Sequence, residues 1–463
     1  MTLAPLARPA IVQEKVHFVG IGGIGLSAIA HILLNWGGRV SGSDLRLSKI
    51  TDELAALGAR VCEGQRAENL GDATLVVISS AIRPDNPEVA EARRRGLPVL
   101  KRADILGEMM AGRHGIAVAG THGKTTTTAM IAHILLETGR DPTYLVGGIL
   151  ANTGTNAGSG QGAAFVIEAD EYDRMFLGLR PRTAVVTHLE MDHPDCFPTL
   201  GDLREAFGRF LDLVPADGRI IACADEPNVR ALVAGRPQAL SYGLSPEAQW
   251  RAAELRPNAR GGLDFDIWAG GVRAGEASLA LPGAYNVKNA LAALAAAQGQ
   301  ELSLAECTAA LASFSGVRRR FELKGEARGV AVVDDYAHHP TAALAALAAA
   351  RQRFPGQGIW AVFQPHTYSR MRALFAEFAC AFGEADHVLV LDVYAAREDR
   401  DAGLQAADLA AAMAGRDVRY CAAHDEAVAI LTEELRPGDV VITLGAGDGF
   451  RIGEKVLDNL AAR

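Results

Sequence analysis

The chain has 463 residues, enough for about three domains of ordinary size. Hydrophobic residues make up 49% and charged residues 22%, close to the globular average, which excludes collagen-like, coiled-coil or largely disordered architectures. The formal net charge of -9 argues against a nucleic-acid-binding protein, although it leaves room for a local site that binds a small phosphorylated molecule.

Six cysteines are scattered along the chain without a C-x-x-C pair, which is typical of a protein in a reducing compartment. Residues 1–15 lack the apolar core of a signal peptide, and no apolar run reaches the roughly 20 residues that a membrane-spanning helix needs. We therefore expect a cytoplasmic protein with no stable membrane insertion, either a monomer or a homodimer.

Strand-like and helix-like segments alternate from the start of the chain, as in a parallel sheet wound with helices. The predicted elements are a strand at 16–20, a helix at 24–36, strands at 39–43 and 74–79, a helix at 87–95 and a strand at 97–100. We expect this first domain to span residues 1–112.

Two further α/β units are expected, at residues 113–316 and 317–463. The second has predicted strands at 115–119, 164–167, 184–187 and 219–223, a helix at 287–298, and a Gly/Asn/Ser-rich loop at 147–162. The third has predicted strands at 330–333, 359–363, 388–393 and 440–444, with an Ala-rich helix at 342–350. No repeat of fixed period occurs, which excludes solenoids and propellers.

The first motif of chemical interest is a glycine-rich turn between a strand and a helix. Gly20, Gly22 and Gly25 fit G-x-G-x-x-G, and Asp44 ends the next strand. Such a turn offers backbone amides to a diphosphate, and the acid can accept a hydrogen bond from a sugar hydroxyl. Alone, the motif would indicate a nicotinamide dehydrogenase, and a tight turn without a ligand is the simpler alternative.

A second motif has the composition of a phosphate-binding loop. Residues Gly120-Thr121-His122-Gly123-Lys124-Thr125-Thr126 follow a predicted strand and precede a helix. Lys124 and backbone N–H groups would neutralise nucleotide phosphates, and the Thr125 hydroxyl would ligate Mg²⁺.

Acidic and histidine residues follow the next two predicted strands. Glu168-Ala169-Asp170-Glu171 comes after one strand, and the stretch from His188 to His193 comes after the other. Carboxylates beside a phosphate loop are natural ligands of Mg²⁺, and an imidazole among them suggests a second metal position. A solvated acidic loop is the alternative interpretation.

Three more clusters lie at predicted strand ends or domain boundaries, at 318–320, 334–340 and 364–370, and a glycine turn at 445–448 follows the last strand. Fixed cations at such places can clamp a transferring phosphoryl group or a carboxylate. A solvated surface is again the alternative for the arginine run.

The order and separation of these segments resemble the Mur ligases over essentially the whole chain. The segments that carry the resemblance are GIGGIG, SSAIRPDNPEV, AGTHGKTTTTAM, EADEYD, EMDH, NVKNAL, GVRRRFE, DDYAHHPT, QPHTYSR and GAGD. The resemblance implies a three-domain α/β fold: a Rossmann-like N-terminal domain for a UDP-sugar, a central P-loop ATPase domain, and a Rossmann-like C-terminal domain for an amino acid.

The resemblance also implies an activity. Within the family, the chain is most similar to the branch that uses ATP and Mg²⁺ to join L-alanine to the lactyl carboxylate of UDP-N-acetylmuramate through an acyl phosphate, in peptidoglycan precursor synthesis. The branch that recycles a whole tripeptide onto the same UDP-sugar is the alternative. A dehydrogenase would leave the phosphate loop unused, and a non-catalytic UDP-sugar sensor would not need Lys124.

Roles for individual residues follow from the resemblance alone. The residues implied in catalysis are Lys124, Glu168, His193, Arg320 and His338, and those implied as metal ligands are Thr125, Glu168 and His193. The residues implied in ATP binding are Gly120, Thr121, His122, Gly123, Lys124, Thr125, Thr126, Asn289 and Arg320. The residues implied in UDP-sugar binding are Gly20, Gly22, Gly23, Ile24, Gly25, Asp44 and Ser80, and those implied in amino-acid binding are Tyr336, His338, His366 and Arg370.

A general base for the incoming amine is open among His338, His339 and His366. The chain departs from the usual pattern of the family at His188, Tyr285 and Thr367, where Asn, His and Arg are common.

Overall fold

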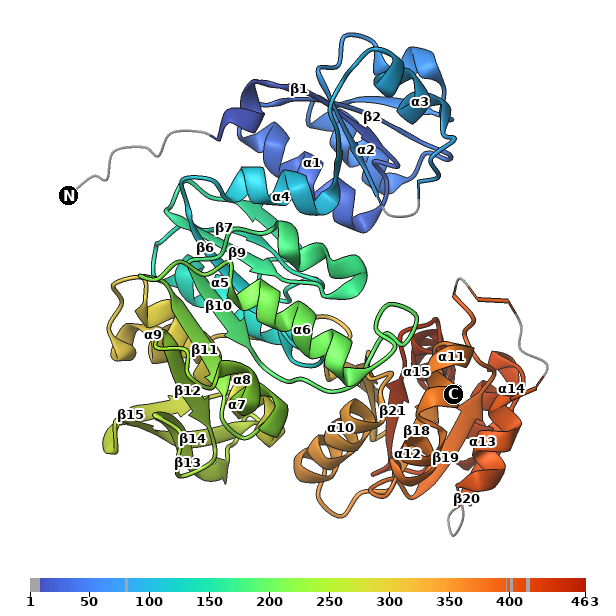
Figure 1. Ribbon diagram of the computed structural model, residues 1–463. Helices are drawn as coiled ribbons and strands as arrows, with labels where there is room; N and C mark the ends of the chain where they lie inside the picture. Colours follow the sequence, from blue (N-terminus) through green and yellow to red (C-terminus); the bar gives the residue numbers. More distant parts are fainter. Residues whose placement is uncertain (1–8, 80–81, 397, 400–402, 414–416) are drawn as a thin grey trace.

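The computed structural model describes residues 9–79, 82–396, 398–399, 403–413 and 417–463. Three separate sheets divide the chain into bodies that follow one another in sequence, and the first and third lie beside the central one (Figure 1). The expected three-domain α/β architecture is confirmed. Within the described residues, no helix combines the length and apolar character needed to cross a membrane.

The N-terminal sheet is parallel throughout, with strand order β3-β2-β1-β4-β5. Its strands are β1 (Lys15–Val19), β2 (Arg39–Asp44), β3 (Arg60–Glu63), β4 (Leu75–Ile78) and β5 (Val99–Lys101). Its helices are η1 (Ala10–Gln13), α1 (Ile24–Asn35), α2 (Lys49–Ala56), η2 (Ala67–Leu70), α3 (Pro87–Arg94) and α4 (Arg102–Met110).

The central sheet has ten strands in the order β15-β14-β13-β12-β11-β10-β6-β9-β7-β8. They are β6 (His114–Ala119), β7 (Thr143–Leu145), β8 (Ala157–Ser159), β9 (Ala164–Glu168), β10 (Thr183–Val186), β11 (Arg219–Cys223), β12 (Ala239–Gly243), β13 (Trp250–Pro257), β14 (Leu263–Ala269) and β15 (Val272–Ser278). The helices are α5 (Lys124–Glu137), η3 (Tyr172–Gly178), α6 (Leu200–Leu211), α7 (Pro227–Val233), α8 (Ala284–Gln298) and α9 (Leu304–Leu311).

The central sheet differs from the sequence prediction in three places, the first of which is β7, a strand that was not predicted. The stretch 147–162 is not all loop, because β8 lies within it and pairs antiparallel with β7. The strands β12 to β15 were not predicted, and β13 to β15 form an antiparallel extension whose exposed polar positions weaken the apolar pattern.

The C-terminal sheet is parallel except at its first strand, in the order β16-β17-β21-β18-β19-β20. Its strands are β16 (Glu322–Ala327), β17 (Val330–Asp335), β18 (Ile359–Phe363), β19 (His387–Leu391), β20 (Asp417–Cys421) and β21 (Val440–Leu444). Its helices are α10 (Pro340–Arg353), α11 (Tyr368–Ala373), α12 (Phe375–Cys380), α13 (Ala406–Ala412), α14 (His424–Glu434) and α15 (Phe450–Ala462).

Helix α5 forms the centre of the middle body. Every residue of α5 from Thr125 to Leu135 is buried, because the helix packs between the sheet and the helices α8 and α9. Alanine lines much of α8, and its small side chain favours the helix and allows close approach. This packing fixes the beginning of α5, where the phosphate loop lies.

Candidate active site

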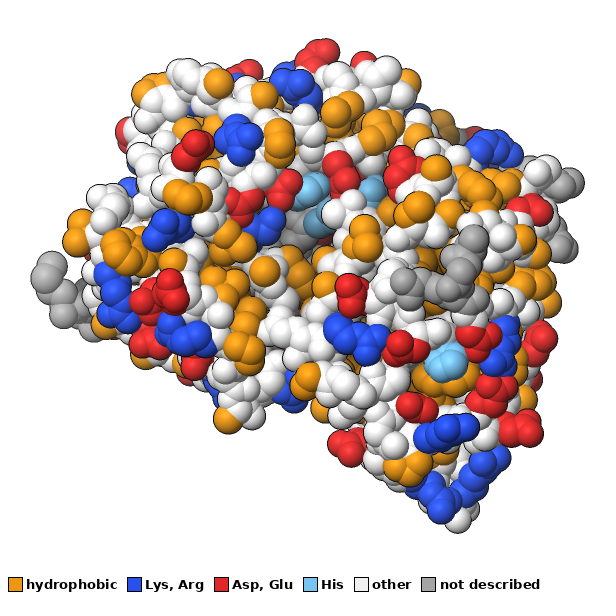
Figure 2. Space-filling model, turned by 90° about the horizontal axis from the view of Figure 1, so that it is seen from below, with side chains coloured by type: hydrophobic (Ala, Val, Ile, Leu, Met, Phe, Trp, Pro, Cys, Tyr) orange, Lys and Arg blue, Asp and Glu red, His pale blue; other side chains and the backbone are white. Residues whose placement is uncertain are grey.

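A cleft of about 1360 Å³ is lined by residues from all three bodies. Gly25 follows β1, Lys124 follows β6 and Tyr336 follows β17, so each lies beyond the carboxyl end of a parallel strand. This is the edge at which α/β sheets bind ligands. Histidine and acidic side chains gather around a hollow near the middle of one face (Figure 2).

Two glycines give the phosphate loop its close packing. Gly120 and Gly123 have φ values of +140° and +81°, which side-chain-bearing residues rarely adopt. A Cβ at Gly120 would lie 2.1 Å from Thr187 Oγ1, and one at Gly123 would lie 2.5 Å from Asn289 Oδ1. The loop therefore needs glycine at both positions to keep its backbone amides close to the end of the sheet.

Lys124 is held inside the loop by an acid that follows the next strand. Its Nζ donates to Glu171 Oε1 at 2.8 Å and to the carbonyl of Gly120 at 2.5 Å. Burial by itself would lower the pKa of Lys124, but Glu171, Glu168 and Asp170 raise it above the usual value. Burial raises the pKa of Glu171 to about 7, against the influence of Lys124. The lysine is thus a positive charge fixed inside the loop.

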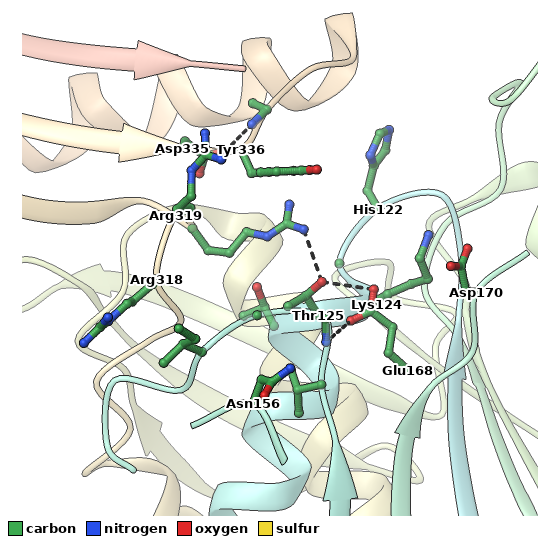
Figure 3. A pocket seen from close by; sticks show the side chains of 18 of the residues that line it. His122, Lys124, Thr125, Asn156, Glu168, Asp170, Arg318, Arg319, Asp335 and Tyr336 are labelled. Atoms are coloured by element: carbon green, nitrogen blue, oxygen red, sulfur yellow. Dashed lines mark hydrogen bonds between the residues drawn. The ribbon is translucent and has the colours of Figure 1, made fainter. Parts of the chain in front are cut away.

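Thr125 and Glu168 lie together at the beginning of α5 (Figure 3), and Arg320 contacts Thr125 there. The Thr125 hydroxyl donates to Glu168 Oε1 at 3.1 Å, and Arg320 Nη2 donates to the same hydroxyl at 3.1 Å. The other carboxylate oxygen of Glu168 accepts a hydrogen bond from the Gly147 amide at 2.8 Å. A hydroxyl and a carboxylate are hard oxygen donors at one point, and they fit Mg²⁺.

His193 lines the same cleft and contacts acids other than Glu168. Its Nε2 is 3.9 Å from Glu171 Oε1 and 3.7 Å from Asp192 Oδ2, and its ring lies edge-on to Tyr172. Burial lowers the pKa of His193, so the neutral imidazole that a metal requires is favoured. Its role as a ligand beside Glu168 stays a prediction.

Arg370 of α11 reaches across to the central body. Its Nη2 donates to Asp192 Oδ1 at 2.8 Å, and both side chains are buried. Its Nη1 donates to the carbonyl of His366 at 2.8 Å. Burial alone would raise the pKa of Asp192, but Arg370 and His193 hold it well below its usual range. The residue predicted to bind an amino acid therefore also joins two domains.

Tyr336, His338 and His366 form one aromatic group in the cleft. The His338 ring lies 5.3 Å from Tyr336 and 5.7 Å from His366, measured between ring centres. Burial lowers the pKa of His338 well below its usual value and lowers that of His366 to about 4. Both imidazoles are thus neutral near pH 7, the form in which a histidine can accept a proton.

The three consecutive arginines have different surroundings. Arg320 reaches Thr125, with its guanidinium 4.9 Å from the centre of the Tyr336 ring. Arg319 pairs with Asp334 at 3.1 Å and donates to the Gly445 carbonyl at 2.9 Å, so it ties β17 to the loop after β21. Arg318 also lines the cleft. Only Arg320 of the three touches the phosphate loop through a side-chain hydrogen bond in the structure.

The N-terminal glycine turn also opens into the cleft. Asp44 accepts a hydrogen bond from the Gly22 amide at 2.9 Å, which fixes the turn against β2. Ile24 lines the cleft and is 70% exposed, while Gly20 and Gly23 form the turn itself through a backbone hydrogen bond. Ser80, predicted to bind the UDP-sugar, lies outside the described residues.

Asn289 lies under the phosphate loop. It is buried, its Oδ1 accepts from Thr127 Oγ1 at 3.2 Å, and its Nδ2 donates to Asn286 Oδ1 at 3.3 Å. Thr121 and Thr126 line the cleft beside it. A contact between Asn289 and adenine stays a prediction.

A separate polar cluster surrounds Glu190. His188 Nε2 lies 3.5 Å from Glu190 Oε1, and His188 Nδ1 lies 3.0 Å from Glu226 Oε2. Burial opposes the charge of His188, but the two carboxylates raise its pKa to about 9. Burial lowers the pKa of His122, which contacts the same Glu190, to about 4.

Sequence reasoning missed several residues that the structure places in the site. Glu171 and Asp192 were present in the quoted motifs, but their partners lie far away in sequence. Arg102 of α4 lines the cleft beside Gly25, and its buried Nε has no hydrogen-bond partner in the structure. No motif marks Arg102, so only its position reveals it.

Comparison with known proteins agrees with this geometry. Three family profiles match in order: "Mur ligase family, catalytic domain" at 15–114, "Mur ligase middle domain" at 118–297, and "Mur ligase, glutamate ligase domain" at 319–447. The UDP-N-acetylmuramate–L-alanine ligase of Syntrophotalea carbinolica is 47% identical over 97% of this chain and 99% of its own. The enzyme of the same name from Salinibacter ruber is 46% identical over 98% and 96%.

Solved structures show the same likeness. The UDP-N-acetylmuramate–alanine ligase of Thermotoga maritima matches with a TM-score of 0.79 at 29% identity, over 97% of this chain and 100% of its own. A murein peptide ligase from Psychrobacter arcticus matches with a TM-score of 0.69 at 27% identity, over 97% and 99%.

The charge on His188 predicts a pH-dependent stability. The pKa of His188 in the folded protein is about 9, above the ordinary value of 6.5. The charged histidine therefore adds to the free energy of unfolding fully below pH 6.5, and this stabilisation is lost as the pH rises through 9. When the pH is raised from 6.5 to 9, we expect the Tm of His188→Asn to fall less than the Tm of the wild type. Both are measured in buffer without divalent cations. Parallel losses in the two proteins would contradict the assignment.

The Arg370–Asp192 pair predicts a second result. Arg370→Ala leaves a buried carboxylate unpaired, which costs about 3 kcal/mol or more. We expect this variant to have a clearly lower Tm, and the double variant Arg370→Ala, Asp192→Asn to recover part of the loss because the unpaired charge is gone. Calorimetry measures the three Tm values, which should fall in the order wild type, double variant, Arg370→Ala. A double variant no more stable than Arg370→Ala would refute the prediction.

Proposed function

The chain belongs to the Mur ligase family, and we propose that its cleft joins L-alanine to the lactyl carboxylate of UDP-N-acetylmuramate, coupled to cleavage of ATP to ADP and phosphate. The observation that carries this proposal is the meeting of Thr125, Glu168 and Arg320. Here the phosphate loop, the Glu168 carboxylate and a cation from the C-terminal domain converge on the Thr125 hydroxyl. The names of the relatives at 46–47% identity supply the choice of L-alanine.

The chemistry explains why such a site is needed. A carboxylate is a poor electrophile, so an amine does not attack it in water. Transfer of the terminal phosphoryl group of ATP to a carboxylate oxygen gives an acyl phosphate. The alanine nitrogen then attacks the carbonyl carbon, the bond from that carbon to the phosphate oxygen breaks, and phosphate leaves with the electron pair.

Lys124 and Arg320 supply positive charge where phosphoryl transfer builds up negative charge. Lys124 is held ready by Glu171 at 2.8 Å, so little rearrangement is needed when phosphate arrives. Arg320 comes from the C-terminal domain, and its contact with Thr125 needs the two domains to be close together. Closure of this kind also excludes water, which would otherwise hydrolyse an acyl phosphate.

The amine must lose a proton to react and to form an amide. His338 and His366 lie in the cleft beside Tyr336, and both are neutral near pH 7. Either can accept that proton, directly or through water. His339 is the weaker candidate, because its Nδ1 faces Glu190 at 3.3 Å and its Nε2 faces the Met191 carbonyl at 3.3 Å.

Thr125 and Glu168 would hold Mg²⁺, with His193 as the ligand of a second ion. The ion would neutralise phosphate oxygens of the nucleotide and so assist the charge shift. The paired hydroxyl and carboxylate oxygens, 3.1 Å apart, support this assignment.

The N-terminal domain would hold the UDP-sugar. Gly25 lines the cleft beside Arg102, whose buried Nε has no hydrogen-bond partner in the structure, and this arginine suits the diphosphate of the UDP-sugar. We place the protein in the cytoplasm and keep domain limits at 1–112, 113–316 and 317–463.

The deciding experiment is release of phosphate from ATP by the purified protein. Release that needs both UDP-N-acetylmuramate and L-alanine is the expected result. Release that needs the tripeptide in place of L-alanine would move the protein to the recycling branch. If neither L-alanine nor the tripeptide supported phosphate release, the proposal would be refuted.

Lys124→Ala separates chemistry from substrate binding. Because Lys124 acts on charge in the transition state, we expect kcat to fall by about 100- to 1000-fold or more while the Kd of UDP-N-acetylmuramate stays near the wild-type value. Phosphate release and calorimetric titration give the two values. If UDP-N-acetylmuramate binding weakened by the same factor as kcat fell, this role would be contradicted.

Glu168→Gln tests the magnesium position. The variant keeps the shape of the side chain but loses its charge, so we expect the Mg²⁺ concentration for half-maximal activity to rise by at least about tenfold. Asp173→Asn, an acid of the neighbouring η3 with a half-exposed side chain, is the matched control. An unchanged Mg²⁺ titration for Glu168→Gln would remove this residue from the metal site.

A further inference from the structure

Three imidazoles converge on one carboxylate oxygen at the edge of the cleft. Glu190 Oε1 lies 3.5 Å from His188 Nε2 and 3.3 Å from His339 Nδ1, and it also contacts His122 Nε2. His339 Nδ1 accepts a hydrogen bond from the Thr341 backbone amide at 3.4 Å, so this nitrogen has no hydrogen to give to Glu190. Two acceptor atoms, His339 Nδ1 and Glu190 Oε1, therefore face each other at 3.3 Å. A divalent cation that replaces the proton on His188 would be held by this oxygen and by the imidazole nitrogens together.

We propose that His122, His188 and Glu190 form a binding site for a divalent transition-metal cation of the zinc class, separate from the Mg²⁺ position at Thr125 and Glu168. The metal-binding atoms of these three residues all lie within 4.8 Å of one another. Small side-chain rotations bring them to the roughly 2 Å bonds that such an ion forms. Within the described ranges, no other group of His, Cys, Asp or Glu residues brings three ligand atoms so close.

The surroundings orient these ligands. His188 presents Nε2 to Glu190 because its Nδ1 faces Glu226 at 3.0 Å, and Lys288 holds that carboxylate in turn at 2.8 Å. Thr341 donates to Glu190 Oε2 at 3.0 Å, which leaves Oε1 directed at the imidazoles. A carboxylate behind a histidine is the usual support of a metal-binding imidazole.

The donor set selects the type of ion. Two imidazoles and one carboxylate suit Zn²⁺ and similar cations, whereas Mg²⁺ prefers oxygen ligands. The His122 and His188 side chains are 24% and 20% exposed, so an ion can enter from solvent. Figure 3 shows the His122 side chain pointing away from Thr125 and Glu168, which separates the two positions.

The site also joins two domains. His122 and His188 belong to the central body, while His339 comes from the C-terminal body and lies 3.3 Å from the same oxygen. The His122 and His339 ring centres are 5.0 Å apart. An ion bound here has His339 within reach as a further ligand.

The test needs neither nucleotide nor substrate, so its result is independent of the proposed ligase activity. Chelator-treated full-length protein is titrated with Zn²⁺ by calorimetry and with Co²⁺ by visible absorption, both in saturating Mg²⁺. We expect one ion per chain. His188→Asn and Glu190→Gln should each weaken binding by about 100-fold or more.

Two control variants locate the ion. His193→Asn removes the imidazole predicted for the Mg²⁺ position, and His424→Asn removes a partly exposed histidine of α14; both should keep the wild-type affinity. Displacement of Zn²⁺ by Mg²⁺, or loss of binding in His193→Asn, would place the ion at the Mg²⁺ position and overturn the proposal. The proposal would also be overturned if neither His188→Asn nor Glu190→Gln bound Zn²⁺ more weakly than the wild type.

Discussion

The structure depends on one constraint of parallel sheets: every strand ends at the same edge. In the central body, β6, β9 and β10 are parallel neighbours, so the segments that follow them must meet. These segments contain the phosphate loop, Glu171 and the stretch 188–193, and Glu168 is the last residue of β9. The N-terminal and C-terminal sheets turn the same kind of edge toward the cleft, which is why one cleft is lined by residues from all three bodies.

Charge pairing keeps this polar edge ordered before any ligand binds. Lys124 is paired with Glu171, and Arg370 with Asp192, each at 2.8 Å. Such pairs lower the cost of holding charges in a partly buried site, and they also position the cations. A paired lysine and a paired arginine thus stand at the same cleft.

Contacts between domains complete the site. Arg320 reaches Thr125, and Arg370 reaches Asp192, so the C-terminal body supplies cations to residues of the central body. The C-terminal residue His339 also contacts Glu190. A catalytic cycle that admits substrates and then excludes water needs contacts of this kind, because they exist only when the domains are close.

The sequence by itself determined the α/β class, most strands of the parallel sheets and the phosphate loop, because these depend on local apolar patterns and on glycines beside a lysine. It did not reveal β12 to β15, and in β13 and β15 exposed polar residues dilute the apolar pattern. Only the tertiary structure decided which charges meet. Glu171 lies 47 positions from Lys124, and Asp192 lies 178 positions from Arg370, so strand order and domain packing bring them together. Glu190 and its three histidines meet for the same reason.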